Sequence, residues 1–213
     1  MPVGGLAGGM PEVVTRGTGE HEVVADRAEI QLTFSAGAAD RSTAVGRLAQ
    51  RMAAVEPALT RAGVEQRQRS VSVHTQWDNN RRAGCTAQEL LVLRMSDLAG
   101  LDELLAALFS AEPDWLNGPH WSLADESAAM REAQRKAVED ARARAQAYAD
   151  ALGGHLGALI RLADDGIEHP YPVPMAMAAE GARMGVDSVR QLGLTPGTVT
   201  VRAVCTAVWS LEH

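Results

Sequence analysis

One segment constrains the fold of this chain more than any other. Residues 125–154 read DESAAMREAQRKAVEDARARAQAYADALGG and predict a helix of about 28 residues, roughly 42 Å long. Its apolar residues recur every three or four positions, which predicts a stripe that packs against a sheet. Most of them are alanines, so we expect the helix to lie close to that sheet. The stripe comprises Met130, Ala133, Ala137, Ala141, Ala145, Tyr148 and Leu152.

Alternating apolar and polar residues predict the strands. Residues 27–36 and 198–211 alternate with a period of two, the pattern of a strand with one buried face. Gly17 and Gly19 are expected to break the first strand of the chain. The other expected strands are residues 12–18, 69–77, 85–95, 120–123 and 155–162, with a turn at 78–84.

Two shorter helices complete the pattern. Residues 42–62 carry an apolar stripe, and Pro57 is expected to kink the last turns. A second stripe, beginning at Leu98 and ending before Pro113, predicts the other helix. Hairpins mixed with helical crossovers predict an α+β fold: a mixed, largely antiparallel sheet with helices packed on one face.

We expect a flexible lead over residues 1–10 and a single domain over 11–213. Residues 164–196 are rich in proline and methionine and show no clear periodicity, which is unusual inside a compact domain. They predict a mobile excursion whose methionines form a flexible cover or an oligomer contact. Binding of cuprous ion by the thioethers is a weaker alternative. These methionines are Met175, Met177 and Met184.

Two segments carry a family resemblance. VVTRGTGEHEVVADRAEIQLTFSA places Gly17 and Gly19 before the step from Asp26 to Ala28, and KAVEDARARAQAYADALGGHLGALIRL covers residues 136–162. Both resemble the SIMPL-domain family, known from YggE-like bacterial proteins: a Gly-x-Gly stretch leading into a strand, and an Ala-x-x-Asp-Ala-x-x-x-Ala helix followed by Leu-Gly and a strand. The resemblance spans about residues 11–211.

The resemblance implies a fold and little chemistry. Family members include periplasmic or envelope proteins, some ring-like oligomers, bacterial proteins linked to oxidative-stress tolerance, and an animal signalling adaptor. No catalytic motif is established for the family, so no catalytic residue carries over. The opening residues, MPVGGLAGGMPEVV, lack the features of a secretory signal. We therefore expect a cytoplasmic protein, or a periplasmic or envelope protein only if a signal has been removed.

Charge and hydropathy exclude two classes of partner. The formal net charge is −7, and lysines and arginines are not gathered into a basic patch. Phosphate binding needs such a patch, so we expect no nucleic-acid partner. No 18 apolar residues run together, so we expect no membrane span.

The residues that could carry chemistry are scattered. Cys85 and Cys205 are interpreted as buried apolar residues, with a single disulfide as the alternative. No histidine has zinc-ligand spacing, and no Gly-x-Ser-x-Gly motif occurs. We predict no catalytic, cofactor or metal residues. Trp77 and Trp121 are expected in the core, or at an interface or ligand pocket.

The sequence thus predicts a non-enzymatic protein that acts through contacts with a still unknown partner protein and with copies of itself. The strand at 198–211 has Val204 and Val208 on the face opposite Cys205 and Trp209, so both faces are apolar. Such a strand at a sheet edge would need a partner, and the two valines are the predicted oligomer contact. The alternative is a small-molecule-binding or oxidative-stress-related protein with a pocket between sheet and helices.

Overall fold

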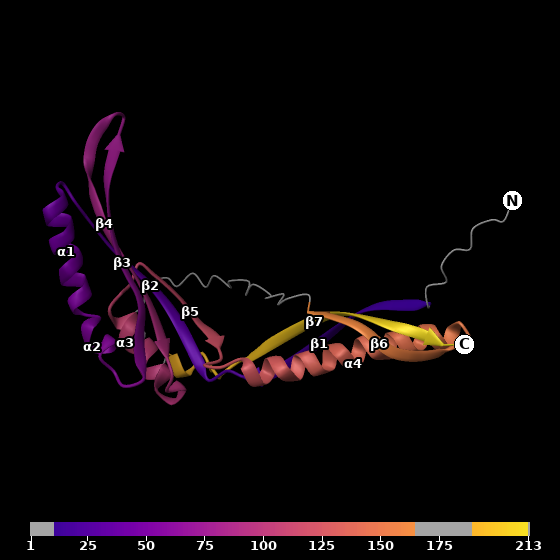
Figure 1. The fold of residues 1–213 in the computed structure, drawn as a ribbon. Helices are drawn as coiled ribbons and strands as arrows, with labels where there is room; N and C mark the ends of the chain where they lie inside the picture. Colours follow the sequence, from indigo (N-terminus) through magenta and orange to yellow (C-terminus); the bar gives the residue numbers. More distant parts are fainter. Residues whose placement is uncertain (1–10, 165–188, 213) are drawn as a thin grey trace. The chain divides into compact units, whose positions relative to one another are not determined.

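The computed structural model describes residues 11–164 and 189–212 (Figure 1). The chain divides into two compact units. The first, called here the three-stranded unit, comprises residues 11–23, 125–164 and 199–212 of the described chain. The second, the four-stranded unit, comprises residues 24–124 and 189–198.

The three-stranded unit consists of one sheet and the long helix α4. The sheet has the order β1-β7-β6, so the last strand of the chain is its middle strand. Figure 1 shows α4 running along these strands. The bounds are β1 Glu12–Val24, α4 Ser127–Ala151, β6 His155–Asp164 and β7 Thr198–Glu212.

The buried stripe of α4 consists of alanines four residues apart. Those predicted from Ala133 to Ala145 are confirmed, each at most 1% exposed. The stripe then continues to Ala149, whereas Tyr148 and Leu152 are 59% and 65% exposed, and their predicted burial is wrong. A spacing of four keeps small residues against the sheet and places Tyr148 one position outside that row. The buried alanines are Ala129, Ala133, Ala137, Ala141, Ala145 and Ala149.

Strand β1 continues through both of its glycines. The prediction that Gly17 and Gly19 break the strand is wrong, because β1 runs on to Val24. A Cβ atom on Gly17 would stand 2.0 Å from the carbonyl oxygen of Ala137, and one on Gly19 would stand 2.1 Å from that of Ala133. The glycines therefore let the helix backbone approach the strand closely.

The four-stranded unit has the sheet order β3-β4-β2-β5. The alternation predicted from residue 27 onward is confirmed in β2, where Ala28, Ile30, Leu32 and Phe34 are fully buried. Strand β4 pairs with β2 and β3 in antiparallel fashion, and β5 pairs with β2 in the same way. The bounds are β2 Arg27–Ala38, β3 Val64–Asp78, β4 Arg81–Met95 and β5 Trp115–Ser122.

Helices complete the core of this unit. Asp40 caps the first helix by accepting a hydrogen bond from the Thr43 N–H, and this bond, with others from Ser42 and Thr43, lowers the pKa of Asp40 to about 2. The expected single kinked helix over 42–62 is in fact two, because the chain turns at Ala54 and restarts with Pro57 in the first turn. The helices are α1 Arg41–Ala53, α2 Glu56–Leu59 and α3 Leu101–Ser110, the last preceded by a 3₁₀ turn, Leu98–Gly100.

The β3–β4 hairpin is longer than predicted. The expected turn over residues 78–84 shrinks to Asn79 and Asn80, which have φ values of 44° and 65°. Asparagine tolerates this left-handed region, so two residues suffice to reverse the chain. Composition alone suggested a wider loop because the strand ends are polar as well.

The predicted α+β class with antiparallel strands is confirmed, although the strands form two sheets where one was expected. Whether residues 11–213 fold as one cooperative domain stays a prediction. The flexible lead and most of the excursion lie outside the described residues. Met175, Met177 and Met184 fall there as well.

Candidate functional site

Side chains of α4 reach the outer edge of β1 between Arg16 and Glu20. The sheet ends at this strand, so its outward-facing backbone groups have no strand partner. Every fourth residue of the helix contacts every second residue of the strand. This match arises because four helix residues and two strand residues span similar lengths, about 6 Å and about 7 Å. The hydrogen bonds are Lys136 Nζ to Glu20 O at 2.8 Å, Thr18 N to Asp140 Oδ2 at 3.0 Å, and Arg144 Nη1 to Arg16 O at 3.2 Å.

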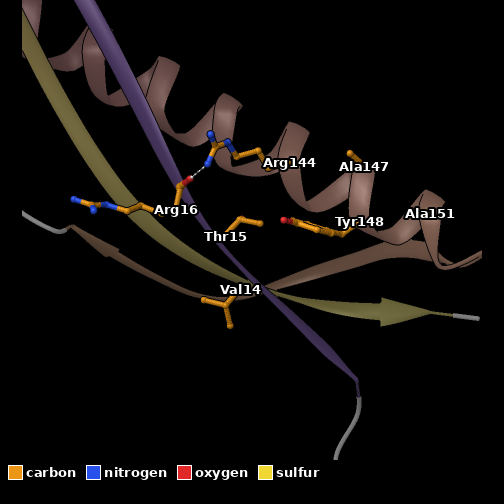
Figure 2. Close-up of a pocket in the computed structure, with 7 residues that line it drawn as sticks. All are labelled: Val14, Thr15, Arg16, Arg144, Ala147, Tyr148 and Ala151. Atoms are coloured by element: carbon orange, nitrogen blue, oxygen red, sulfur yellow. Dashed lines mark hydrogen bonds between the residues drawn. The ribbon is translucent and has the colours of Figure 1, made fainter.

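This series ends where a groove opens. The next helix residue in the series is Tyr148, and the next outward strand residue is Val14. Within the described chain no hydrogen bond joins them. Here lies a cavity of about 540 Å³, called the β1 groove (Figure 2). Its lining residues are Val14, Thr15, Arg16, Arg144, Ala147, Tyr148 and Ala151.

The β1 groove combines apolar walls with positive charge. Figure 2 shows Tyr148 pointing from α4 toward β1, whereas Val14 points away from the helix. Val14 and Tyr148 are about 60% exposed, at 61% and 59%. Arg16 and Arg144 are the charged residues of the lining, and no acidic residue is among them. Arg144 is itself paired with a carboxylate outside the lining, because its Nε lies 3.5 Å from Asp140 Oδ2. The groove is thus a partly apolar place bordered by guanidinium groups.

The opposite edge of the same sheet is β6, and it exposes large apolar side chains. Leu159, Ile160 and Leu162 are 45%, 48% and 47% exposed. Arg161 interrupts this run. The pairing of β6 with β7 shifts register on either side of Leu159, so the strand is bulged there. The three side chains, called the β6 patch, form an apolar surface along an edge strand.

The other sheet edges carry charged residues, a proline or covering side chains, which oppose pairing with another strand. In the four-stranded unit, β3 is an edge, and its exposed residues include Glu65, Arg67 and Arg69. Strand β5 is the other edge, and Pro119 removes one backbone donor there. The α4 side chains cover β1 from Arg16 to Glu20. Large exposed apolar side chains also occur on these edges: Val71 and Trp77 on β3, Trp115 on β5, and Val14 and Val24 on β1. Strand β6, with three, carries the most among the edge strands of the described chain.

The two valines predicted as an oligomer contact are buried within one chain. Val204 and Val208 are 3% and 4% exposed, and their strand β7 is flanked by β1 and β6. The expectation of an edge strand with an open apolar face is therefore wrong for β7. The sequence pattern shows apolar residues on both faces of this strand. It does not reveal whether the strand lies in the middle of a sheet or at its edge.

Other candidate residues serve the core or lie apart. Cys85 and Cys205 are both buried and are not joined in a disulfide, as the favoured interpretation predicted. Trp121 packs against the core of its unit, whereas Trp77 is exposed near the hairpin turn. No group of three or more His, Cys, Asp or Glu side chains within the described residues is placed to hold a metal ion.

Among the residues that the structure describes, one carboxylate is buried, and it has a structural explanation. The Glu89 side chain is 5% exposed and accepts a hydrogen bond from Arg69 Nε. Arg69 Nη1 also lies 3.3 Å from Glu56 Oε1. A buried charge requires such a partner. We assign this pair to the stability of the β3–β4 contact.

The comparisons with known proteins agree with the resemblance described above. The model of the family "SIMPL: Protein of unknown function (DUF541)" matches residues 13–209, nearly the whole chain. A search of the curated proteins finds no match. In the described part of the chain, no helix is long and apolar enough to cross a membrane.

Proposed function

For a chain that belongs to the SIMPL family, whose function is unknown, we propose a non-enzymatic role carried out through protein–protein contacts, in which the chain first associates with copies of itself. The three-stranded unit supplies the contact. This proposal keeps the self-association predicted from the sequence and moves its surface from β7 to β6.

The β6 patch is the observation that carries the proposal. Three large apolar side chains on one edge strand are each nearly half exposed. Fully burying an exposed side chain of this kind contributes about 1.5–3 kcal/mol, so a partner that covers the exposed half of each gains roughly half of that per side chain. Edge strands also offer unpaired backbone groups, which favour association with another strand. A second copy supplies a partner wherever the protein is concentrated.

Charged substitutions in the β6 patch test the proposal. Ile160→Lys combined with Leu162→Lys should lower the native mass measured by light scattering, because two desolvated lysines would oppose burial of the patch. Val71→Lys is the matched control: Val71 is also an exposed apolar residue of an edge strand, in the other unit. A mass reduced equally by both changes, or by neither, would contradict the proposed surface.

A second candidate function is supported by the β1 groove. Its volume of about 540 Å³ lies in the range of small-molecule sites, and it lies between sheet and helix, where the sequence-based alternative placed a pocket. Arg144 and Tyr148 would suit an amphipathic anion. Native mass spectrometry of the purified protein would detect such a ligand as a discrete mass added to the chain.

A further inference from the structure

We propose that the four-stranded sheet binds a neutral carbohydrate chain on the face that its helices leave open. The core that α1 and α3 cover includes Leu32 of β2 and Leu91 of β4, which mark the covered face. The opposite side is called the open face. Its centre consists of Gln31, Thr33 and Ser35 of β2 with the residues in register with them on the neighbouring strands. This surface belongs to the four-stranded unit, so the inference does not depend on the proposed self-association.

The centre of the open face carries no charged side chain. The residues in register there are amides, hydroxyls, two aliphatic residues and a tryptophan. Charged residues make up 22% of the chain and normally lie on the surface, so a solvent-facing sheet surface without them is unusual. The next row along the strands is charged, and its Arg94 Nη2 lies 3.7 Å from Glu29 Oε2. A neutral centre favours a neutral ligand over a phosphate-bearing one, which needs basic residues.

Four amide side chains give the open face its hydrogen-bonding capacity. Each amide offers two donor hydrogens and an acceptor oxygen, and each of the four is at least partly exposed. Their side chains form no hydrogen bond with another described residue. Sugar hydroxyls both donate and accept, so they match amides without any need for charge. The four amides are Gln31, Gln68, Gln88 and Asn117.

Trp115 adds an aromatic border to the same face. It stands in register with Thr33 on β5 and is 46% exposed, while Leu90 flanks Thr33 on β4. An indole combines a large apolar ring with a polar N–H, and a sugar ring has an apolar C–H face surrounded by hydroxyls. A sugar that stacks on Trp115 therefore turns its hydroxyls toward the amides. Four strands about 4.8 Å apart span roughly 14 Å, enough for several linked sugar rings.

The composition of the open face favours a carbohydrate over a protein partner. Centres of protein contacts are enriched in aromatic residues, methionine and arginine, whereas this surface has one aromatic residue among hydroxyls and amides. The border at Trp115 is also neutral as a whole, because the neighbouring Asp114 is paired with Arg51 Nη1 at 2.9 Å.

Isothermal titration calorimetry of the full chain with three neutral hexasaccharides, cellohexaose, maltohexaose and chitohexaose, tests the inference. At least one should bind, and Trp115→Ala should weaken that binding about tenfold. Trp77→Ala is the matched control, since Trp77 is 67% exposed and lies beyond the stretch of the hairpin that pairs with β2. Gln31→Glu places a carboxylate at the centre of the open face and should also weaken binding. Gln50→Glu, at an exposed position of α1, should not.

Circular dichroism should be unchanged in these variants, because each position is at least partly exposed. If none of the three hexasaccharides binds the unmodified chain, the inference fails, while self-association through β6 stands because it uses the other unit. Equal weakening by Trp115→Ala and Trp77→Ala would also overturn it. A native mass lowered by Gln31→Glu, in a chain that binds no hexasaccharide, would assign the open face to a protein contact instead.

Discussion

Gly17 of β1 lies directly against Ala137 of α4, with no space for a side chain between them. A Cβ atom on the glycine would stand 2.0 Å from the Ala137 carbonyl oxygen and 2.7 Å from the Ala141 Cβ. Because the obstructing atoms are mostly helix backbone, the helix and strand would have to separate to admit a methyl group.

Gly17→Ala should therefore destabilise the three-stranded unit by about 1–3 kcal/mol, the usual cost of overpacking. Urea denaturation followed by circular dichroism measures the change. Gly37→Ala is the matched control, since Gly37 is also a strand glycine and a Cβ there meets nothing within 4 Å. Equal midpoints for the two variants would show that the helix–strand contact is looser than described.

Ala141→Leu tests the same contact from the helix side. Ala141 is fully buried, and its carbonyl oxygen accepts a hydrogen bond from Thr15 Oγ1 at 2.8 Å. The larger side chain should cost about 1–3 kcal/mol. Ala143→Leu, an exposed position on the same helix, should change stability by less than about 0.5 kcal/mol. A thermal melt unchanged by Ala141→Leu would mean that another face of α4 is buried.

Periodicity predicted which segments form helices and strands better than it predicted which elements pack beside them. The alternation of β2 and the alanine stripe of α4 are local patterns imposed by one buried face, and both are confirmed. The continuation of β1 through Gly17 could not be predicted locally. In the sequence, a glycine that ends a strand cannot be distinguished from a glycine that lets a helix pack closely against the strand. The two differ only in which element packs on the strand.

The residues of the candidate site could not be predicted from the sequence for a similar reason. Tyr148 fits an apolar stripe by composition, yet it lies outside the row of alanines that touches the sheet. The β6 patch is an edge only because β7 joins the sheet between β1 and β6. Strand order depends on pairing between distant segments, which a single sequence does not reveal.

The stability of the four-stranded unit should depend on pH through Asp114. Burial raises the pKa of this carboxyl, but hydrogen bonds from Arg51 and from the Ser35 N–H outweigh that effect and hold the pKa below its usual value. A lowered pKa in the folded state means that ionised Asp114 stabilises the fold above the unfolded-state pKa of about 4. This contribution is lost as the pH falls through the folded-state pKa.

Asp114→Asn should thus lower the free energy of unfolding at neutral pH by an amount on the order of 1 kcal/mol, kept small because the side chain is 41% exposed. The difference from the unmodified chain should shrink below about pH 4. Urea denaturation at several pH values measures it, with Glu22→Gln, an exposed residue of β1, as the control. A difference that stays constant with pH would rule out the ionised pair as its source.

Self-association is the central claim, and the native mass of the unmodified chain tests it most directly. Sedimentation velocity across micromolar concentrations should give a mass of at least twice the 22.6 kDa chain, because the β6 patch of one copy is then covered by another. A single species near 22.6 kDa at every concentration would contradict the claim.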